Sequence, residues 1–180
     1  MAKGILFTFL VAVAFLACDS HLADSPPPGF LKLSMTIDPG QFEVSPNDTL
    51  LLNIASIRLW KGAERREWAI VSDTNRTYNV FLLSGGNTVS ISNKQIMYLP
   101  AADYTRLTVR VLAQDSVMIL GGKRFLVRIP QEEYQIVNVD QEIRIAAGET
   151  IALKLIFEAE PSLTFQLGSY RLIPTFRLSH

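Results

Sequence analysis

The chain has 180 residues, a length that is typical of one globular domain. Lys plus Arg and Asp plus Glu are balanced at 17 each, so the composition offers no basic field for nucleic acid and no acidic tail. The single cysteine excludes an intramolecular disulfide.

The first residues have the layout of a secretory signal. Lys3 supplies a positive charge, and residues 5–17 then run apolar almost without interruption. Such a stretch is too short to span a bilayer, which takes about 20 residues. The run Phe-Leu-Ala-Cys that ends at Cys18 resembles the lipobox of bacterial lipoproteins, with Phe in place of the usual Leu. We therefore expect cleavage before Cys18 and attachment of its thiol to membrane lipid; a plain signal peptide that leaves a free cysteine is the alternative.

Residues 18–29 predict a tether between this anchor and the rest of the chain. The segment is polar, lacks periodicity and ends in three prolines and a glycine, which is typical of a semi-rigid spacer. We accordingly divide the chain into a signal peptide (1–17), a lipidated cysteine with a flexible tether (18–29) and one domain (30–180).

From residue 30 onward, apolar and polar residues alternate with period two, which indicates strands with one buried face. In the first strand, Leu31, Leu33 and Met35 point one way while the residues between them point the other. In chain order, strands are predicted at residues 31–37, 49–60, 67–71, 77–83, 88–92, 106–111, 117–120, 124–129, 142–146, 151–157 and 170–178.

Turn residues separate these strands where an all-β fold needs them. Gly85-Gly86 and Gly121-Gly122 supply positions that tolerate positive φ. Strands at this spacing, with almost no helix-period stretches, predict a single antiparallel β-sandwich of transthyretin-like or immunoglobulin-like architecture. Pro174 cannot donate to a strand ladder, so the last strand should lie at an edge or carry a bulge.

Several short motifs, in order, resemble a family of bacterial lipoproteins. They are the opening strand with Asp38-Pro39, residues 53–60 (Asn-Ile-Ala-Ser-Ile-Arg-Leu-Trp), residues 79–87, residues 102–107 around Tyr104, residues 147–150, and residues 170–174 (Tyr-Arg-Leu-Ile-Pro). Together they are similar to the "domain of unknown function" family four-three-eight-two. The resemblance implies a transthyretin-like or prealbumin-like sandwich in the cell envelope, with no established activity and no catalytic residues to carry over.

The residues that usually carry catalysis are scarce. His21 falls in the tether and His180 is the last residue, so neither is placed for general-base or metal chemistry. The paired acids Glu132 and Glu133 fall in a predicted loop, where solvated charge explains them better than a glycosidase pair. We therefore expect no enzyme, no metal and no cofactor.

Aromatic residues are the remaining candidates for a binding site. Trp60, Trp68 and Tyr78, with Tyr98 and Tyr104, could form a platform that stacks on sugar rings or anchors a protein partner. Core packing is the competing interpretation for the same residues.

Three functions remain open at this point. The leading expectation is a non-enzymatic envelope lipoprotein whose sandwich serves binding or assembly and exposes the outward residues Arg106, Arg110, Arg124 and Arg128. A carbohydrate-binding module is the second, suggested by Trp60 and Trp68. A fimbrial or pilus-type subunit is the third, and it rests on architecture alone.

Overall fold

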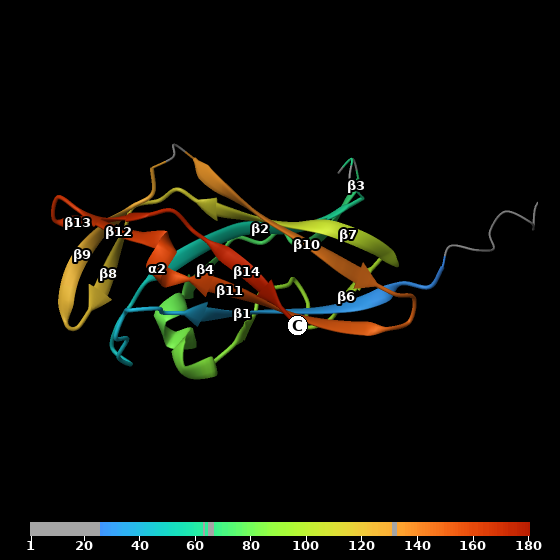
Figure 1. Cartoon of the computed structure of the whole chain (residues 1–180), viewed down its shortest axis with the longest axis horizontal. Coiled ribbons are helices and arrows are strands. Elements are labelled where there is room, and N and C mark those ends of the chain that lie inside the picture. Colours follow the sequence, from blue (N-terminus) through green and yellow to red (C-terminus); the bar gives the residue numbers. More distant parts are fainter. Residues whose placement is uncertain (1–25, 63, 65–66, 131–132) are drawn as a thin grey trace, which may run out of the picture.

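A computed structural model describes residues 26–62, 64, 67–130 and 133–180, which form an all-β domain (Figure 1). The strands are β1 (Gly29–Asp38), β2 (Leu51–Lys61), β3 (Glu67–Ser72), β4 (Arg76–Asn79), β5 (Val89–Ser90), β6 (Met97–Leu99), β7 (Ala102–Leu112), β8 (Ser116–Leu120), β9 (Lys123–Arg128), β10 (Tyr134–Ile145), β11 (Thr150–Glu158), β12 (Leu163–Gln166), β13 (Ser169–Leu172) and β14 (Phe176–Ser179). Two short helical segments, η1 (Val80–Gly86) and α2 (Ala159–Ser162), complete the described elements.

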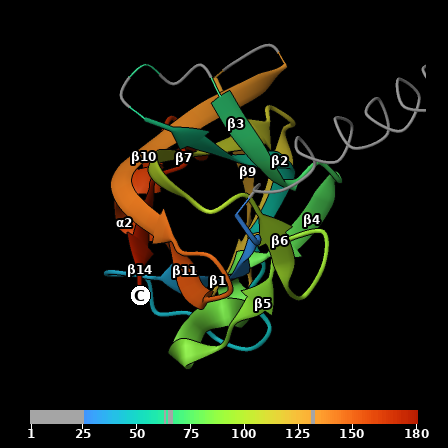
Figure 2. The same ribbon diagram turned by 90° about the vertical axis from the view of Figure 1, so that its right-hand side faces the viewer.

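The strands form three sheets. Sheet A has the order β14-β11-β1-β5, with β6 also paired to β1; sheet C has the order β10-β7-β2-β3, with β4 also paired to β2. Viewed end-on, sheet C lies above sheet A with the core between them (Figure 2). The smaller sheet B, ordered β12-β13-β9-β8, lies at the end of the long axis opposite the point where the chain enters the domain (Figure 1).

One hydrophobic core joins the inner faces of the sheets. Alternate residues of each strand point inward, so Leu33 and Leu155 of sheet A belong to the same buried cluster as Leu59 and Leu107 of sheet C. The members of the core cluster fall between Leu31 and Leu178. Residues 26–180 therefore contain the whole described core, and we expect them to fold without the preceding segment.

The predicted all-β sandwich is confirmed, and two of its strand pairs are parallel. The first strand, β1, runs parallel to β11 from the pair Phe30 and Thr150 to the pair Asp38 and Glu158. In sheet B, β13 runs parallel to β9. The other strand pairings of the described residues, including the long β10–β7 and β2–β7 ladders, are antiparallel.

The predicted strand over residues 77–83 is wrong beyond Asn79. The chain there forms the helical turn η1, whose side chains Val80, Phe81 and Leu83 are all buried. A strand would send the adjacent Val80 and Phe81 to opposite faces, whereas a helical turn buries both against β1. The Thr36 hydroxyl on β1 fixes this turn, lying 3.1 Å from the Leu83 carbonyl oxygen and 2.7 Å from that of Asn87.

The single strand predicted over residues 170–178 is two strands. Pro174 separates β13 of sheet B from β14, which is an edge strand of sheet A. The strand predicted at 142–146 is the last part of β10, which begins at Tyr134. The sequence pattern missed β6, β12 and α2 because each is only three or four residues long.

A buried carboxylate holds sheet B against the end of β2. Thr49 and Ile119 exchange two backbone hydrogen bonds, at 2.9 and 2.8 Å. The adjacent Asp48 carboxylate accepts hydrogen bonds from the backbone N–H groups of Ser45 (2.8 Å) and Gly121 (2.9 Å). The bond from Ser45 is the main cause that lowers the pKa of Asp48 below its ordinary value. Sheet B is thus fixed to the sandwich by its β8–β9 hairpin.

Candidate binding face

The outer face of sheet C carries large aromatic and cationic side chains on neighbouring strands. Register places Trp60 of β2 between Trp68 of β3 and Arg106 of β7. Arg58 and Arg110 follow on the same outward side of β2 and β7, and Tyr134 opens β10. We call this surface the tryptophan–arginine face and define it by Arg58, Trp60, Trp68, Arg106, Arg110 and Tyr134.

Ring contacts hold two guanidinium groups in place on this face. The Trp60 and Trp68 ring centroids lie 6.3 Å apart with planes tilted by 49°. Arg58 Cζ lies 4.2 Å from the centroid of the Trp68 ring, and Arg110 Cζ lies 3.7 Å from that of Tyr134. These are cation–π distances, so each guanidinium is attracted to its ring and its orientation is restricted.

Hydrogen bonds fix the indole of Trp60 across three strands. Its Nε1–H donates to Thr108 Oγ1 at 2.9 Å, and the Thr108 hydroxyl donates to Asn138 Oδ1 at 2.8 Å. Thr108 is buried. These two hydrogen bonds therefore connect β2, β7 and β10 and fix the orientation of the Trp60 ring.

The three arginines differ in how their charge is balanced. Arg106 forms a bidentate pair with Asp140, at 2.6 and 3.0 Å, and this pairing raises the pKa of Arg106. Within residues 26–62, 64, 67–130 and 133–180, Arg58 and Arg110 form no ion pair. The Nε of Arg110 is also buried with no hydrogen-bond partner among them. Two fixed positive charges therefore remain open to an anionic group.

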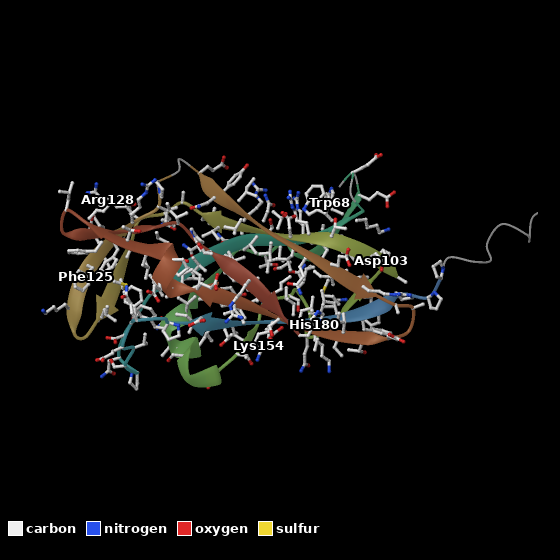
Figure 3. All side chains as sticks on the ribbon, in the orientation of Figure 1. Trp68, Asp103, Phe125, Arg128, Lys154 and His180 are labelled. Atoms are coloured by element: carbon white, nitrogen blue, oxygen red, sulfur yellow. The ribbon has the colours of Figure 1, made fainter. Side chains whose placement is uncertain are left out.

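A shallow hollow of about 340 Å³ lies between these side chains. Arg58, Trp60 and Arg110 line it together with Ile136, whose side chain is 53% exposed. Trp68 stands beside it and is 42% exposed. Figure 3 shows Trp68 on the side of the sandwich opposite Lys154 of sheet A. The hollow thus offers aromatic, aliphatic and cationic groups to one ligand.

The structure brings together two of the three predicted aromatic site residues. Trp60 and Trp68 are neighbours on the outer face, whereas Tyr78 on β4 pairs with Leu52 and packs against the core. Burial raises the pKa of Tyr78, although Arg76 opposes this shift. Tyr78 therefore does not belong to the tryptophan–arginine face.

The two other tyrosines of the predicted platform lie elsewhere. Tyr98 on β6 is 63% exposed and contacts Phe30, with ring centroids 5.2 Å apart. Tyr104 is fully buried and its hydroxyl donates to the Pro100 carbonyl at 2.9 Å. Core packing thus explains Tyr104, as the competing interpretation proposed.

Sequence reasoning missed Tyr134 and Ile136. Both lie in the part of β10 that precedes the predicted strand. The period-two pattern around them could have predicted this part of the strand, because the inward residues Val137 and Val139 alternate with outward ones. Of the arginines expected to be exposed, Arg106 and Arg110 are only partly so, because they pack across the face.

Cys18 and His21 lie outside the described residues. His180 is exposed at the end of the chain. In the described part, no three His, Cys, Asp or Glu side chains are grouped so that they could hold a metal ion. Neither described helix has the length and apolar character that a membrane-spanning helix requires.

Comparison of the chain with protein-family models, curated proteins and solved structures gave no match. The resemblance to family four-three-eight-two therefore rests on the short sequence motifs around residues such as Tyr104 and Pro174.

Proposed function

We propose that this chain is an exported lipoprotein of the bacterial cell envelope that binds a partner through its tryptophan–arginine face and catalyses no reaction. The observation that carries this proposal is the pair of ring-stacked guanidinium groups, Arg58 and Arg110, beside an open hollow. Both are held in position before any partner arrives, which lowers the entropic cost of binding.

The partner that best fits the face is an acidic protein surface in the envelope. Trp, Tyr and Arg are the residues that most often dominate the binding energy of protein interfaces. The planar guanidinium groups of Arg58 and Arg110 match carboxylates in two-point contacts. Trp68 and Ile136 add exposed apolar area around those charges.

A glycan is the second candidate ligand, and the Trp60–Trp68 pair favours it. Aromatic faces stack on sugar rings, and these two rings lie side by side on the surface. An acidic sugar would add a carboxylate for Arg110.

The anchor is tested with the full-length chain and the substitution Cys18→Ser. We expect the wild type to sediment with membranes and to carry the mass of an attached lipid. The variant should lose that mass and either appear in soluble form or remain an uncleaved precursor. Unchanged mass and unchanged membrane fractionation would contradict lipidation at Cys18.

The binding face is tested by capture from solubilised envelope proteins on immobilised residues 26–180. We expect a defined complex that is lost with Arg110→Gln and with Trp68→Ala. The matched controls are Lys154→Gln, an exposed cation of sheet A, and Tyr98→Ala, an exposed aromatic residue of β6. Capture that survives both face variants, or that the controls also abolish, overturns the assignment of this surface.

The glycan alternative is tested by tryptophan fluorescence. The chain has two tryptophans, and both lie on this face, so intrinsic tryptophan emission reports on it alone. Saturable changes on titration with acidic polysaccharides, abolished by Arg110→Gln, would select the glycan. An unperturbed spectrum across acidic and neutral polysaccharides excludes it.

A further inference from the structure

Sheet B carries a second cationic surface, at the end of the molecule opposite the start of β1 at Gly29 (Figure 1). Alternation along β9 sends Phe125 and Val127 toward the core and leaves Arg124, Leu126 and Arg128 exposed on the outer face. Neighbouring strands add Val117, which pairs with Leu126, and Arg171, which pairs with Arg128. We call this surface the arginine end face and define it by Val117, Arg124, Leu126, Arg128 and Arg171.

Like charges stand side by side on the arginine end face. Arg128 and Arg171 are register partners on adjacent parallel strands. Like charges at such positions repel each other and destabilise a sheet. The outward residues of sheet B include no Asp or Glu, and Asp115, which precedes β8, lines one hollow together with the two arginines. Among the residues that the structure describes, no ion pair joins Asp115 to either arginine. The surface is therefore poised to take an anion from outside.

Apolar side chains project beside these charges. Leu167, at the tip of the β12–β13 hairpin, is fully exposed, and its φ of 47° is unfavourable for leucine. Leu126 on the outer face is 40% exposed. A hollow of about 580 Å³ lies between Leu167 and the Arg128–Arg171 pair. An apolar tip next to paired arginines combines the two attractions that bind proteins to the surface of an anionic bilayer.

We propose that the arginine end face docks on the surface of a bilayer that contains anionic phospholipid. Lipid phosphates then neutralise the Arg128–Arg171 pair, and Leu167 enters the boundary between headgroups and acyl chains. A soluble polyanion could supply negative charge to the arginines but offers no apolar phase for Leu167. A protein surface would need a pocket shaped for the protruding leucine, whereas a bilayer takes it up without one. Figure 3 shows Arg128 at the end of the molecule that lies away from the point of chain entry.

This contact is independent of Cys18 and of the tryptophan–arginine face. If the chain is also anchored through its tether to the same bilayer, attachment at both ends lays the long axis of the domain along the membrane. Sheet B is fixed rigidly enough for this role, because the Thr49–Ile119 bridge and the Asp48 carboxylate attach its β8–β9 hairpin to the sandwich.

The test is co-sedimentation of residues 26–180, which lack Cys18, with vesicles of phosphatidylcholine alone or mixed with phosphatidylglycerol. We expect binding to the mixed vesicles only, weakening as salt is raised. Affinity should fall roughly fivefold for each arginine removed, so the double variant Arg128→Gln and Arg171→Gln should lose more than tenfold.

The variant Leu167→Gly tests whether Leu167 enters the bilayer without destabilising the fold. Glycine relieves the positive φ at this position, so the variant should be at least as stable as the wild type while it binds the mixed vesicles several-fold more weakly. Lys154→Gln is the control for a cation lost from another surface and should leave binding unchanged.

Three results would each overturn the proposal: no binding to the mixed vesicles at low salt, full binding by the double arginine variant, or an equal loss with Lys154→Gln. Binding to soluble acidic polysaccharide without binding to vesicles would also reject it. Circular dichroism confirms that each variant is folded. Since Arg110 and Trp68 are intact in these variants, failure here leaves the proposed partner-binding function untouched.

Discussion

The outer faces of sheets A and C follow the same alternation but carry very different side chains. The long strands β1 and β11 of sheet A present small or flexible residues to solvent, among them Lys32, Ser34, Ala152 and Lys154. The aromatic pair Phe30 and Tyr98 of this sheet lies where β6 joins β1. Sheet C presents Trp60 and its ring-stacked arginine neighbours in the corresponding outward positions. The alternation determines which residues face outward but does not require aromatic ones there. The large side chains of sheet C are therefore additions to what the fold needs, and they can be tested as such.

The largest expected effect concerns the inner faces, where the two sheets should behave alike. Leu155→Ala in sheet A and Leu107→Ala in sheet C each remove a fully buried side chain from the shared core. We expect each to lower the free energy of unfolding by roughly 2–5 kcal/mol, measured by urea denaturation. A negligible loss for one of them would show that its sheet does not share the core.

Tyr104, on the inner side of sheet C, should make the domain sensitive to alkali. Burial raises the pKa of Tyr104 to about 12, above its ordinary value of 10.0. The folded state therefore holds this proton more tightly than the unfolded state, so stability is unaffected below pH 10 and falls as pH rises from 10 toward 12. Unfolding curves of the wild type and Tyr104→Phe over this range measure the effect. Equal alkaline sensitivity of the two proteins would exclude Tyr104 as its source.

Substitutions on the outer faces should change the free energy of unfolding by less, and by different amounts in the two sheets. Trp60→Phe in sheet C removes the hydrogen bond to Thr108 and should lower the free energy of unfolding by about 1 kcal/mol. Lys154→Ala in sheet A should stay within about 0.5 kcal/mol of the wild type. Thermal unfolding of both variants checks the comparison, which fails if Lys154→Ala is the more damaging.

The smallest effects are expected from surface ion pairs, and one pair from each sheet gives the comparison. In sheet C, Arg106 meets Asp140 at 2.6 Å; in sheet A, Arg177 lies 3.2 Å from both Asp38 and Glu158. Double-mutant cycles for Arg106 with Asp140 and for Arg177 with Glu158 should each give a coupling of roughly 0.2–1 kcal/mol, decreasing with salt. A coupling well above this range, or one that salt does not weaken, contradicts simple surface pairing.

Sequence patterns predicted the fold where a residue's neighbours along the chain determine its environment. Period-two alternation located β1, β7, β9 and β11 because one face of each strand is buried. It failed at residues 80–83, where Val80 and Phe81 are both buried by a helical turn against β1. That outcome depends on which strand lies next to the segment, and a local pattern does not contain this information.

The candidate site likewise could be predicted only where its residues lie close together along the chain. Trp60 and Trp68 could be suspected as a pair because the hairpin of β2 and β3 brings nearby residues together. Tyr134 joins them only through the strand order β10-β7-β2-β3. The Arg128–Arg171 pair likewise depends on a parallel contact between segments far apart in the chain. Such long-range neighbours are set by packing of the whole domain.

The position of β1 has a mechanical consequence for an anchored protein. This strand starts at Gly29, the last residue of the predicted tether, and lies inside sheet A between β11 and β5. A pull on the tether acts along the strand axis, across the hydrogen bonds that join β1 to β11 from Phe30 to Asp38. These bonds are then loaded together in shear, whereas an edge strand pulled sideways would lose them one at a time. Tension between membrane and partner is thus expected to meet one of the most force-resistant parts of the domain.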